Sequence, residues 1–207
     1  MFITLEGPDG SGKTTMMNRI TQYLEEKGID FIVTREPGGT QIGEEIRNII
    51  LDAKNKNMAS ETEALLYAAS RAQHVHEKIN PALKEGKIVL CERFILSSLA
   101  YQGIGRKLGI EEVYMINHFA IKGVKPDLTL FFRIDPAVSL NRKVEKGGDR
   151  LEQEGIQFHQ QVYNGYMKLL ELYPENIRVI DASKSKEDVF RQCISSIEEI
   201  LKRRNKI

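Results

Sequence analysis

The stretch FITLEGPDGSGKTT, residues 2–15, decides the fold of this chain. Phe2 to Leu5 is a short apolar run of the kind that forms a buried strand, and residues 13–27 follow a helical pattern. The glycine-rich segment between them matches the phosphate-binding pattern G-x-x-x-x-G-K-[ST]. The order strand, loop, helix is the setting in which that pattern forms a P-loop. The sequence therefore predicts a site for a nucleoside triphosphate at its beginning.

Each position of this loop has an expected role. Glycines allow successive backbone N–H groups to curl around an anion, and the helix N-terminus adds a partial positive charge. We expect Lys13 to reach the β and γ phosphates and Thr14 to ligate Mg²⁺. The expected ATP-binding residues are Gly7, Pro8, Asp9, Gly10, Ser11, Gly12, Lys13 and Thr14.

Composition excludes several other classes of protein. The chain has 207 residues, of which 41% are hydrophobic and 29% charged, and its formal net charge is +1. A nucleic-acid partner is not expected, because the chain lacks a basic excess. The longest apolar runs are only as long as strands, so we expect no membrane association. Cys91 and Cys193 lack ligand-type spacing and are expected to be reduced core thiols of a cytoplasmic protein.

Apolar runs of strand length alternate with helical patterns along the whole chain. This alternation predicts an α/β fold with a mostly parallel sheet covered on both faces. No linker or repeat divides the chain, so residues 1–207 are expected to form a single domain. Helix starts are expected at Ser60, with Glu63 completing a capping box, at Asp135 and at Ser185. The predicted strands are Phe2 to Leu5, Phe31 to Thr34, Lys87 to Cys91, Leu128 to Ile134 and Arg178 to Ile180.

The segments after the second strand suggest a second ligand. In such a sheet, ligands bind at the carboxyl ends of the strands. Arg35 opens the stretch REPGG there, and Arg47 follows in the next helical pattern, so the two guanidinium groups can clamp a second phosphate. Tyr67 and Arg71 are four residues apart on one helix face. A ring beside a fork of donors suits a stacked base that is also hydrogen-bonded on its edge.

The third strand ends in an acid, and a possible lid follows the fourth. Glu92 comes after four apolar residues, as in an element that holds Mg²⁺ beside a nucleotide. Ser98, Tyr101 and Gln102 then supply a hydroxyl, a ring and an amide. Residues 142–154 carry basic side chains around two glycines, a pattern typical of a lid that delivers cations and excludes water.

These motifs together resemble the bacterial thymidylate kinases. The resemblance rests on EGPDGSGKTT, TREPGG, TEALLYAASRAQH, SSLAYQG and DRLEQE, which occur in family order across the whole chain. It implies a three-layer P-loop NTPase-type fold with a five-stranded parallel sheet flanked by helices. It also implies Mg²⁺- and ATP-dependent conversion of dTMP to dTDP by a homodimer. The implied substrate-binding residues are Asp9, Arg35, Arg47, Tyr67, Arg71, Arg93, Ser98, Tyr101 and Gln102.

Resemblance also suggests where the catalytic arginine lies. One type of family member has it in the P-loop and another in the lid. Positions 8–11 contain no arginine here, whereas the lid contains Arg142 and Arg150. The chain therefore resembles the lid type, with Lys13, Arg93, Arg142 and Arg150 as the implied catalytic residues.

Two other functions are weighed against this interpretation. Glu92-Arg93-Phe94 replaces the usual Asp-Arg-Tyr, and Glu-Arg at this position also resembles deoxynucleoside kinases, where the carboxylate removes a proton from a 5′-hydroxyl. Such a kinase, however, has no anion for Arg35 and Arg47 to bind. A P-loop switch protein would need a guanine-reading Asn-Lys-x-Asp element, which the sequence lacks. The four histidines are expected to be packing or surface residues.

Overall fold

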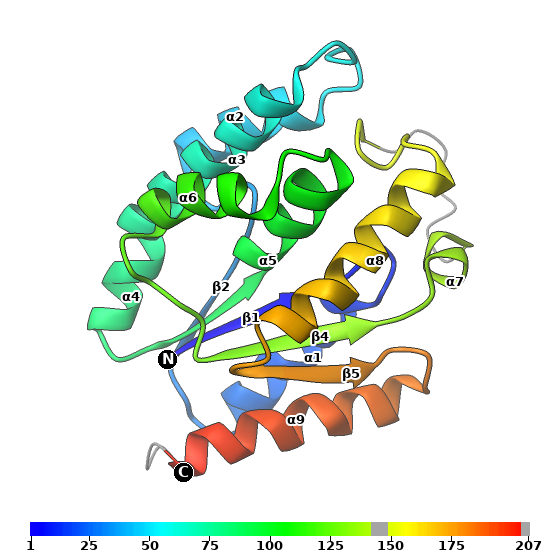
Figure 1. Cartoon of the computed structure of the whole chain (residues 1–207). Helices are drawn as coiled ribbons and strands as arrows, with labels where there is room; N and C mark the ends of the chain where they lie inside the picture. Colours follow the sequence, from blue (N-terminus) through cyan, green and yellow to red (C-terminus); the bar gives the residue numbers. More distant parts are fainter. Residues whose placement is uncertain (142–148, 204–207) are drawn as a thin grey trace.

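A computed structural model of the chain describes residues 1–141 and 149–203. Its centre is a parallel sheet of five strands in the order β2-β3-β1-β4-β5 (Figure 1). The observed strands match the five predicted ones to within one residue at each end. They are β1 (Phe2–Glu6), β2 (Phe31–Arg35), β3 (Ile88–Glu92), β4 (Leu128–Arg133) and β5 (Ile177–Asp181).

Helices cover both faces of the sheet and connect its strands. In Figure 1, α9 and α1 lie on one side of the strands, and α3, α5, α6 and α8 lie on the other. The α-helices are α1 (Lys13–Glu26), α2 (Gln41–Leu51), α3 (Ser60–His74), α4 (Asn80–Lys84), α5 (Ile95–Ser98), α6 (Ile110–Ile121), α7 (Pro136–Asn141), α8 (Ile156–Leu172) and α9 (Lys186–Arg203). Two π-helical segments, η1 (Val75–Ile79) and η2 (Leu99–Gly105), continue α3 and α5.

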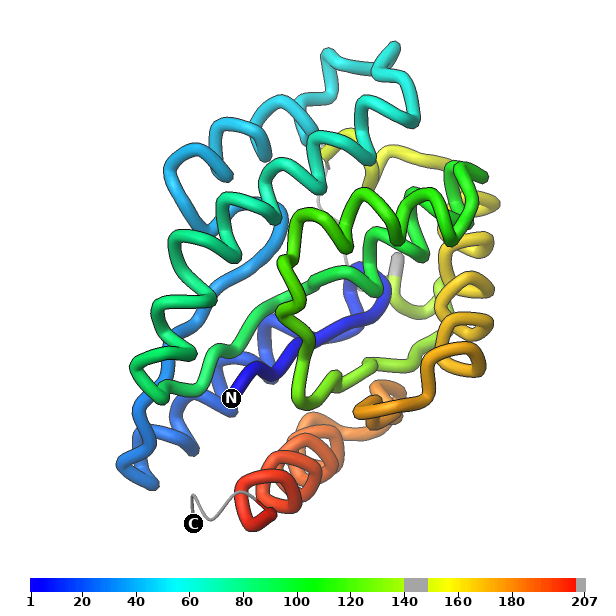
Figure 2. Tube along the Cα trace, turned by 60° about the vertical axis from the view of Figure 1, so that its left-hand side comes forward, coloured from blue at the N-terminus to red at the C-terminus, as the bar shows by residue number. Residues whose placement is uncertain are grey.

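Alternating strand residues pack into apolar clusters on opposite faces of the sheet. Ile3 and Leu5 point toward α1 and α9, where they pack in an apolar cluster with Ile20 and Ile197. Phe2 points to the opposite face, among residues of η1, β3 and α6. Figure 2 shows the result as α9, in red, separated by the strands from the cyan and green helices. Burial on both faces explains why the three central strands, β1, β3 and β4, are nearly continuous apolar runs in the sequence.

The predicted helix starts differ in outcome. Asp135 accepts a hydrogen bond from the Ala137 amide at the start of α7, and Ser185 Oγ accepts one from the Asp188 amide at the start of α9, so both predictions are confirmed. The capping box at Ser60 is wrong. Ala59 is the N-cap of α3, and the Glu63 carboxylate binds side chains elsewhere.

The long helical pattern after Ser60 is real but is not a single α-helix. At η1 the Asn80 amide donates to the Val75 carbonyl, five residues back. Pro81 follows directly and has no amide hydrogen, so the usual bond to Glu77 cannot form there. None of the helices in the described part of the chain is long and apolar enough to cross a membrane.

Candidate active site

The P-loop joins the carboxyl end of β1 to α1, as predicted. Gly10 has φ of +72°, and a Cβ there would lie 2.2 Å from the Ser139 carbonyl oxygen of α7. Gly12 has φ of +91° and caps α1. Only glycine adopts these positive φ values without strain, and at Gly10 only glycine also leaves room for the Ser139 carbonyl. The loop lines a cavity of about 630 Å³ together with Lys184, which precedes α9, and Lys186 and Val189 of α9.

Lys13 folds back onto its own loop. Its Nζ donates to the carbonyl oxygens of Gly7 and Pro8, at 3.1 and 2.8 Å, and the residue is only 4% exposed. Burial, with the nearby positive charge of Arg93 as a smaller cause, lowers the pKa of Lys13 to about 7. Bound phosphates favour the charged ammonium, so they raise this pKa again.

We therefore expect ATP binding to take up a proton at alkaline pH. At pH 8.5 Lys13 is largely neutral before binding and charged afterwards, so uptake approaches about one proton per site, and affinity falls as pH rises above 7. Calorimetric titration of Mg-ATP in two buffers of different ionisation enthalpy measures this uptake. Adenosine, which lacks phosphates, is the control. Equal proton uptake for ATP and adenosine would contradict the assignment.

Thr14 and Glu92, the two predicted Mg²⁺ ligands, lie side by side. Thr14 Oγ1 donates to Glu92 Oε2 at 2.9 Å. Mg²⁺ needs only one or two protein oxygens, because phosphates and water complete its shell. In the part of the chain that the structure describes, no cluster of three acidic, histidine or cysteine residues forms another metal site. The donor set at Thr14 and Glu92 therefore fits Mg²⁺ held mainly by a nucleotide.

A second cavity of about 360 Å³ opens beside the P-loop. It shares Asp9, Thr14 and Glu92 with the first cavity, so the two meet at the pair of predicted metal ligands. The structure brings together here every substrate-binding residue predicted from the sequence: Asp9, Arg35, Arg47, Tyr67, Arg71, Arg93, Ser98, Tyr101 and Gln102. These residues come from the P-loop, β2, α2, α3, α5, η2 and the segment after β3.

Two arginines at one end of this cavity lie close enough to repel each other. The Arg35 guanidinium forms a bidentate pair with Glu44, at 2.7 and 3.0 Å, and both side chains are exposed. Arg47 donates to the Pro37 carbonyl at 2.9 Å. Burial, and then the charge of Arg35, lower the pKa of Arg47. An anion bound between Arg35 and Arg47 would relieve this repulsion.

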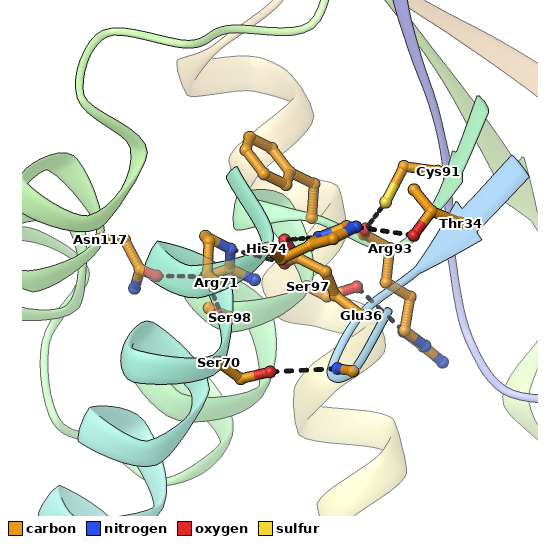
Figure 3. Close-up of polar contacts among 12 residues, drawn as sticks. Thr34, Glu36, Ser70, Arg71, His74, Cys91, Arg93, Ser97, Ser98 and Asn117 are labelled. Atoms are coloured by element: carbon orange, nitrogen blue, oxygen red, sulfur yellow. Dashed lines mark hydrogen bonds and ion pairs between the residues drawn. The ribbon is translucent and has the colours of Figure 1, made fainter. Parts of the chain in front are cut away.

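Arg71 also lines this cavity and is held by a buried network, drawn in Figure 3. Its Nε donates to Glu36 Oε2 at 2.6 Å, and its Nη1 donates to Ser98 Oγ at 2.9 Å and to Asn117 Oδ1. The Arg71 and Glu36 side chains are each 2% exposed. A buried charge pair of this kind is stable only when its hydrogen bonds are satisfied. The network therefore fixes the guanidinium in one position on the cavity wall.

His74 extends this network toward β2. Its Nδ1 lies 2.9 Å from Glu36 Oε1, and its Nε2 lies 2.6 Å from Thr34 Oγ1. A Cβ on Gly39 would approach the His74 ring and the Thr34 hydroxyl to 2.8 and 2.7 Å, so glycine is required at that position. His74 is thus a buried packing residue, in line with the expectation, and its ring also orients the acid that holds Arg71.

Arg93 lies at the centre of the site in an unusual backbone conformation. Its φ is +67°, while its amide still donates to the Leu5 carbonyl at 2.9 Å, extending the β1 to β3 ladder. Its Nη2 donates to Asp9 Oδ1 at 2.8 Å, and Tyr101 Oη donates to the other oxygen of Asp9 at 3.1 Å. A left-handed residue other than glycine is uncommon and is often found at functional sites.

Arg150 does not lie where the lid hypothesis requires. Its side chain is 7% exposed, its Nη2 donates to Glu63 Oε2 at 2.7 Å, and its Nε donates to the Ile50 carbonyl at 2.8 Å. Arg150 lines neither of the two cavities. The expectation that it reaches the transferring phosphoryl group does not match this geometry. Arg142, the other predicted lid arginine, lies outside the described residues.

Several residues of the site were missed at the sequence level. They are buried polar groups that hydrogen-bond to cavity residues or to one another, and Glu36 and Ser97 also line the cavity: Glu6, Glu36, Glu63, His74, Ser97, Asn117 and Tyr166. Glu6 accepts from Ser97 Oγ at 2.5 Å, and burial raises the pKa of this carboxyl group. The only available signal was a polar residue inside an otherwise apolar pattern, as at Asn117. Cys91 and Cys193 are free and buried, as predicted.

Comparison with known proteins agrees with this arrangement. The family model described as thymidylate kinase matches residues 5–193. A thymidylate kinase of Finegoldia magna is 61% identical over 206 residues, covering 99% of each chain. One from a Geobacillus species is 52% identical and covers 95% of each chain. The crystal structure of thymidylate kinase from Ehrlichia chaffeensis superposes with a TM-score of 0.77 at 33% identity, covering 95% of this chain and 98% of that one.

Proposed function

Because this chain belongs to the thymidylate kinase family, we propose that it transfers the γ-phosphoryl group of ATP to dTMP, giving dTDP. The observation that carries this proposal is the meeting of two cavities at Thr14 and Glu92, one formed by a P-loop and the other lined by paired arginines. ATP would bind on the P-loop side. The monophosphate would enter from the other side, with its phosphate toward Arg35 and Arg47.

Residues between the two cavities are placed to assist the transfer. When bound with ATP, Mg²⁺ would neutralise charge on the β and γ phosphates, and Thr14 and Glu92 would hold it directly or through water. Arg93 would donate to both phosphate groups, because its guanidinium lies beside the P-loop residue Asp9 and also lines the dTMP cavity. No base is needed, since the attacking phosphate oxygen is already an anion.

The base end of the cavity suits thymine. Tyr67 would stack on the ring, and Arg71 would donate from Nη2, which has no hydrogen-bond partner among the described residues, to the O4 carbonyl. Tyr101 would pack where a 2′-hydroxyl would lie. The thymine methyl contributes only about 1 to 3 kcal/mol of discrimination in a pocket of this kind, so some dUMP turnover is expected.

The arginine pair also argues against a deoxynucleoside kinase. Among the described residues Arg47 forms no ion pair with an acidic side chain, and the charge of Arg35 repels it, so an anion would be favoured at this end of the cavity. A nucleoside offers none. Glu92, the base that such a kinase would need, instead accepts from Thr14 beside the P-loop.

The proposal is tested by measuring ADP release from Mg-ATP with dTMP, dUMP, dCMP, AMP or thymidine as acceptor. Fast turnover with dTMP, weaker turnover with dUMP and none with thymidine is the expected result. Phosphorylation of thymidine with dTMP ignored would overturn the proposal and make Glu92 a general base.

We further propose that the enzyme is a cytoplasmic homodimer with one catalytic domain per chain. Large apolar side chains are exposed on neighbouring helices, namely Leu65 on α3 and Met115 and Phe119 on α6, with Phe119 81% exposed. A patch of this kind on a helix pair is typical of an interface between subunits. Light scattering is expected to give twice the chain mass of 23.6 kDa, and a monomer mass would contradict the dimer.

A further inference from the structure

Gln102 is held in one amide orientation by a residue outside the cavity. Gln102 Nε2 donates to Glu63 Oε1 at 2.8 Å. A carboxylate only accepts hydrogen bonds, so it must receive the NH₂ group of the amide and cannot face its oxygen. Gln102 Oε1 has no hydrogen-bond partner in the described part of the chain, and Gln102 lines the base cavity. The cavity is therefore offered an acceptor from Gln102.

The acceptor from Gln102 lies in the same cavity as a donor from Arg71. Among the described residues, His159 Nε2 is the only side-chain nitrogen or oxygen that is both buried and unpartnered. The unpartnered Oε1 of Gln102 and Nη2 of Arg71 are therefore accessible to solvent, and both residues line the cavity. One acceptor and one donor match the N3–H and O4 of thymine or uracil. Cytosine offers the reverse, a bare N3 and an N4 amino group.

We propose that Glu63 is a positioning residue that sets the choice of thymine over cytosine by fixing the orientation of the Gln102 amide. This inference rests on the proposed dTMP kinase activity. Glu63 itself does not line the cavity, so it acts only through Gln102. Glu36 plays the matching part for Arg71, since it receives Nε and leaves Nη2 free.

The other partners of Glu63 hold its carboxylate in place. Arg106 donates from Nε and Nη2, at 3.3 and 3.1 Å, and Arg150 donates from Nη2 at 2.7 Å. Glu63 is 1% exposed. A buried carboxylate that receives donors from three side chains has no freedom to turn away from Gln102. The orientation of the amide is thus built into the folded protein before any substrate binds.

The test is the substitution Glu63→Gln. The new amide can accept from Arg106 and Arg150 with its oxygen while offering its NH₂ to Gln102, which permits Gln102 to turn and present a donor to the base. We expect the ratio of kcat/KM for dTMP to that for dCMP to fall at least about tenfold, mainly because kcat/KM for dTMP falls. Because both substrates are measured on one preparation, partial unfolding cancels in the ratio.

Two control variants separate positioning from general damage. Glu61→Gln makes the same chemical change on an exposed position of α3, and Arg106→Gln removes donors from Glu63 while leaving its bond to Gln102. Both are expected to keep the wild-type ratio. A Glu63→Gln enzyme that loses activity on both nucleotides equally would overturn the proposal. Failure of the dTMP kinase assignment would appear separately, as a wild-type enzyme without dTMP turnover.

Discussion

Replacing Arg93 with alanine is expected to lower kcat by about 10³-fold while changing the affinity for dTMP much less. An arginine that stabilises the transition state of phosphoryl transfer contributes factors of about 10³ to 10⁵. Among the arginines of the described part of the chain, Arg93 is best placed for this, because it bonds Asp9 of the P-loop and lines the cavity proposed for dTMP. Single-turnover kinetics, with dTMP affinity measured by calorimetry, separates the two effects.

The matched control is Arg178→Ala. Arg178 lies near the amino end of β5, away from the carboxyl ends of the strands, and pairs with exposed Glu199. It is expected to leave turnover unchanged. Arg93→Lys retains the charge but not the guanidinium fork, and its turnover is expected to lie between those of wild type and Arg93→Ala. Near wild-type turnover of Arg93→Ala would remove Arg93 from the mechanism.

Replacing Arg47 with methionine is expected to raise the KM for dTMP by about 10- to 100-fold with a smaller change in kcat. A hydrogen bond to a charged group contributes about 1.5 to 3 kcal/mol, which corresponds to this range. Arg47 donates to the Pro37 carbonyl and forms no ion pair with an acidic side chain in the described part of the chain, so the phosphate would be its main electrostatic partner. Steady-state kinetics with varied dTMP measures the effect.

Thymidine supplies the control for Arg47. It fills the base and sugar positions but carries no phosphate, so its inhibition constant is expected to be the same for Arg47→Met and wild type. If thymidine binding weakens as much as dTMP binding, Arg47 supports the cavity as a whole and is not a phosphate ligand.

Local patterns predicted the framework of the molecule well. The strands follow directly from apolar runs, and the P-loop follows from glycine spacing between a strand and a helix, since both depend on residues close together in the sequence. The clustering of Arg35, Glu92 and Tyr101 also followed, because the carboxyl ends of parallel strands must meet at one edge.

Partners from distant segments could not be predicted in the same way. The spacing between Ser60 and Glu63 predicts that Glu63 caps a helix, yet Glu63 binds Arg150, 87 residues away. The sequence pattern predicts that Arg150 is a basic residue of a lid, yet its guanidinium is buried against α2 and α3. A charged residue looks the same in sequence whether it faces solvent or another charge. The packing of helices against the sheet decides which of the two environments a charged residue occupies.

The close packing around Gly39 limits how this segment can change in evolution. His74, Thr34 and Gly39 lie within contact of one another, on α3, β2 and the loop between β2 and α2. A larger residue at Gly39 could be accommodated only if a smaller side chain replaced His74 or if β2 shifted. A single substitution at Gly39 produces neither change. Relatives are therefore expected to vary at these three positions together or not at all, whereas the exposed face of α9 drifts one residue at a time.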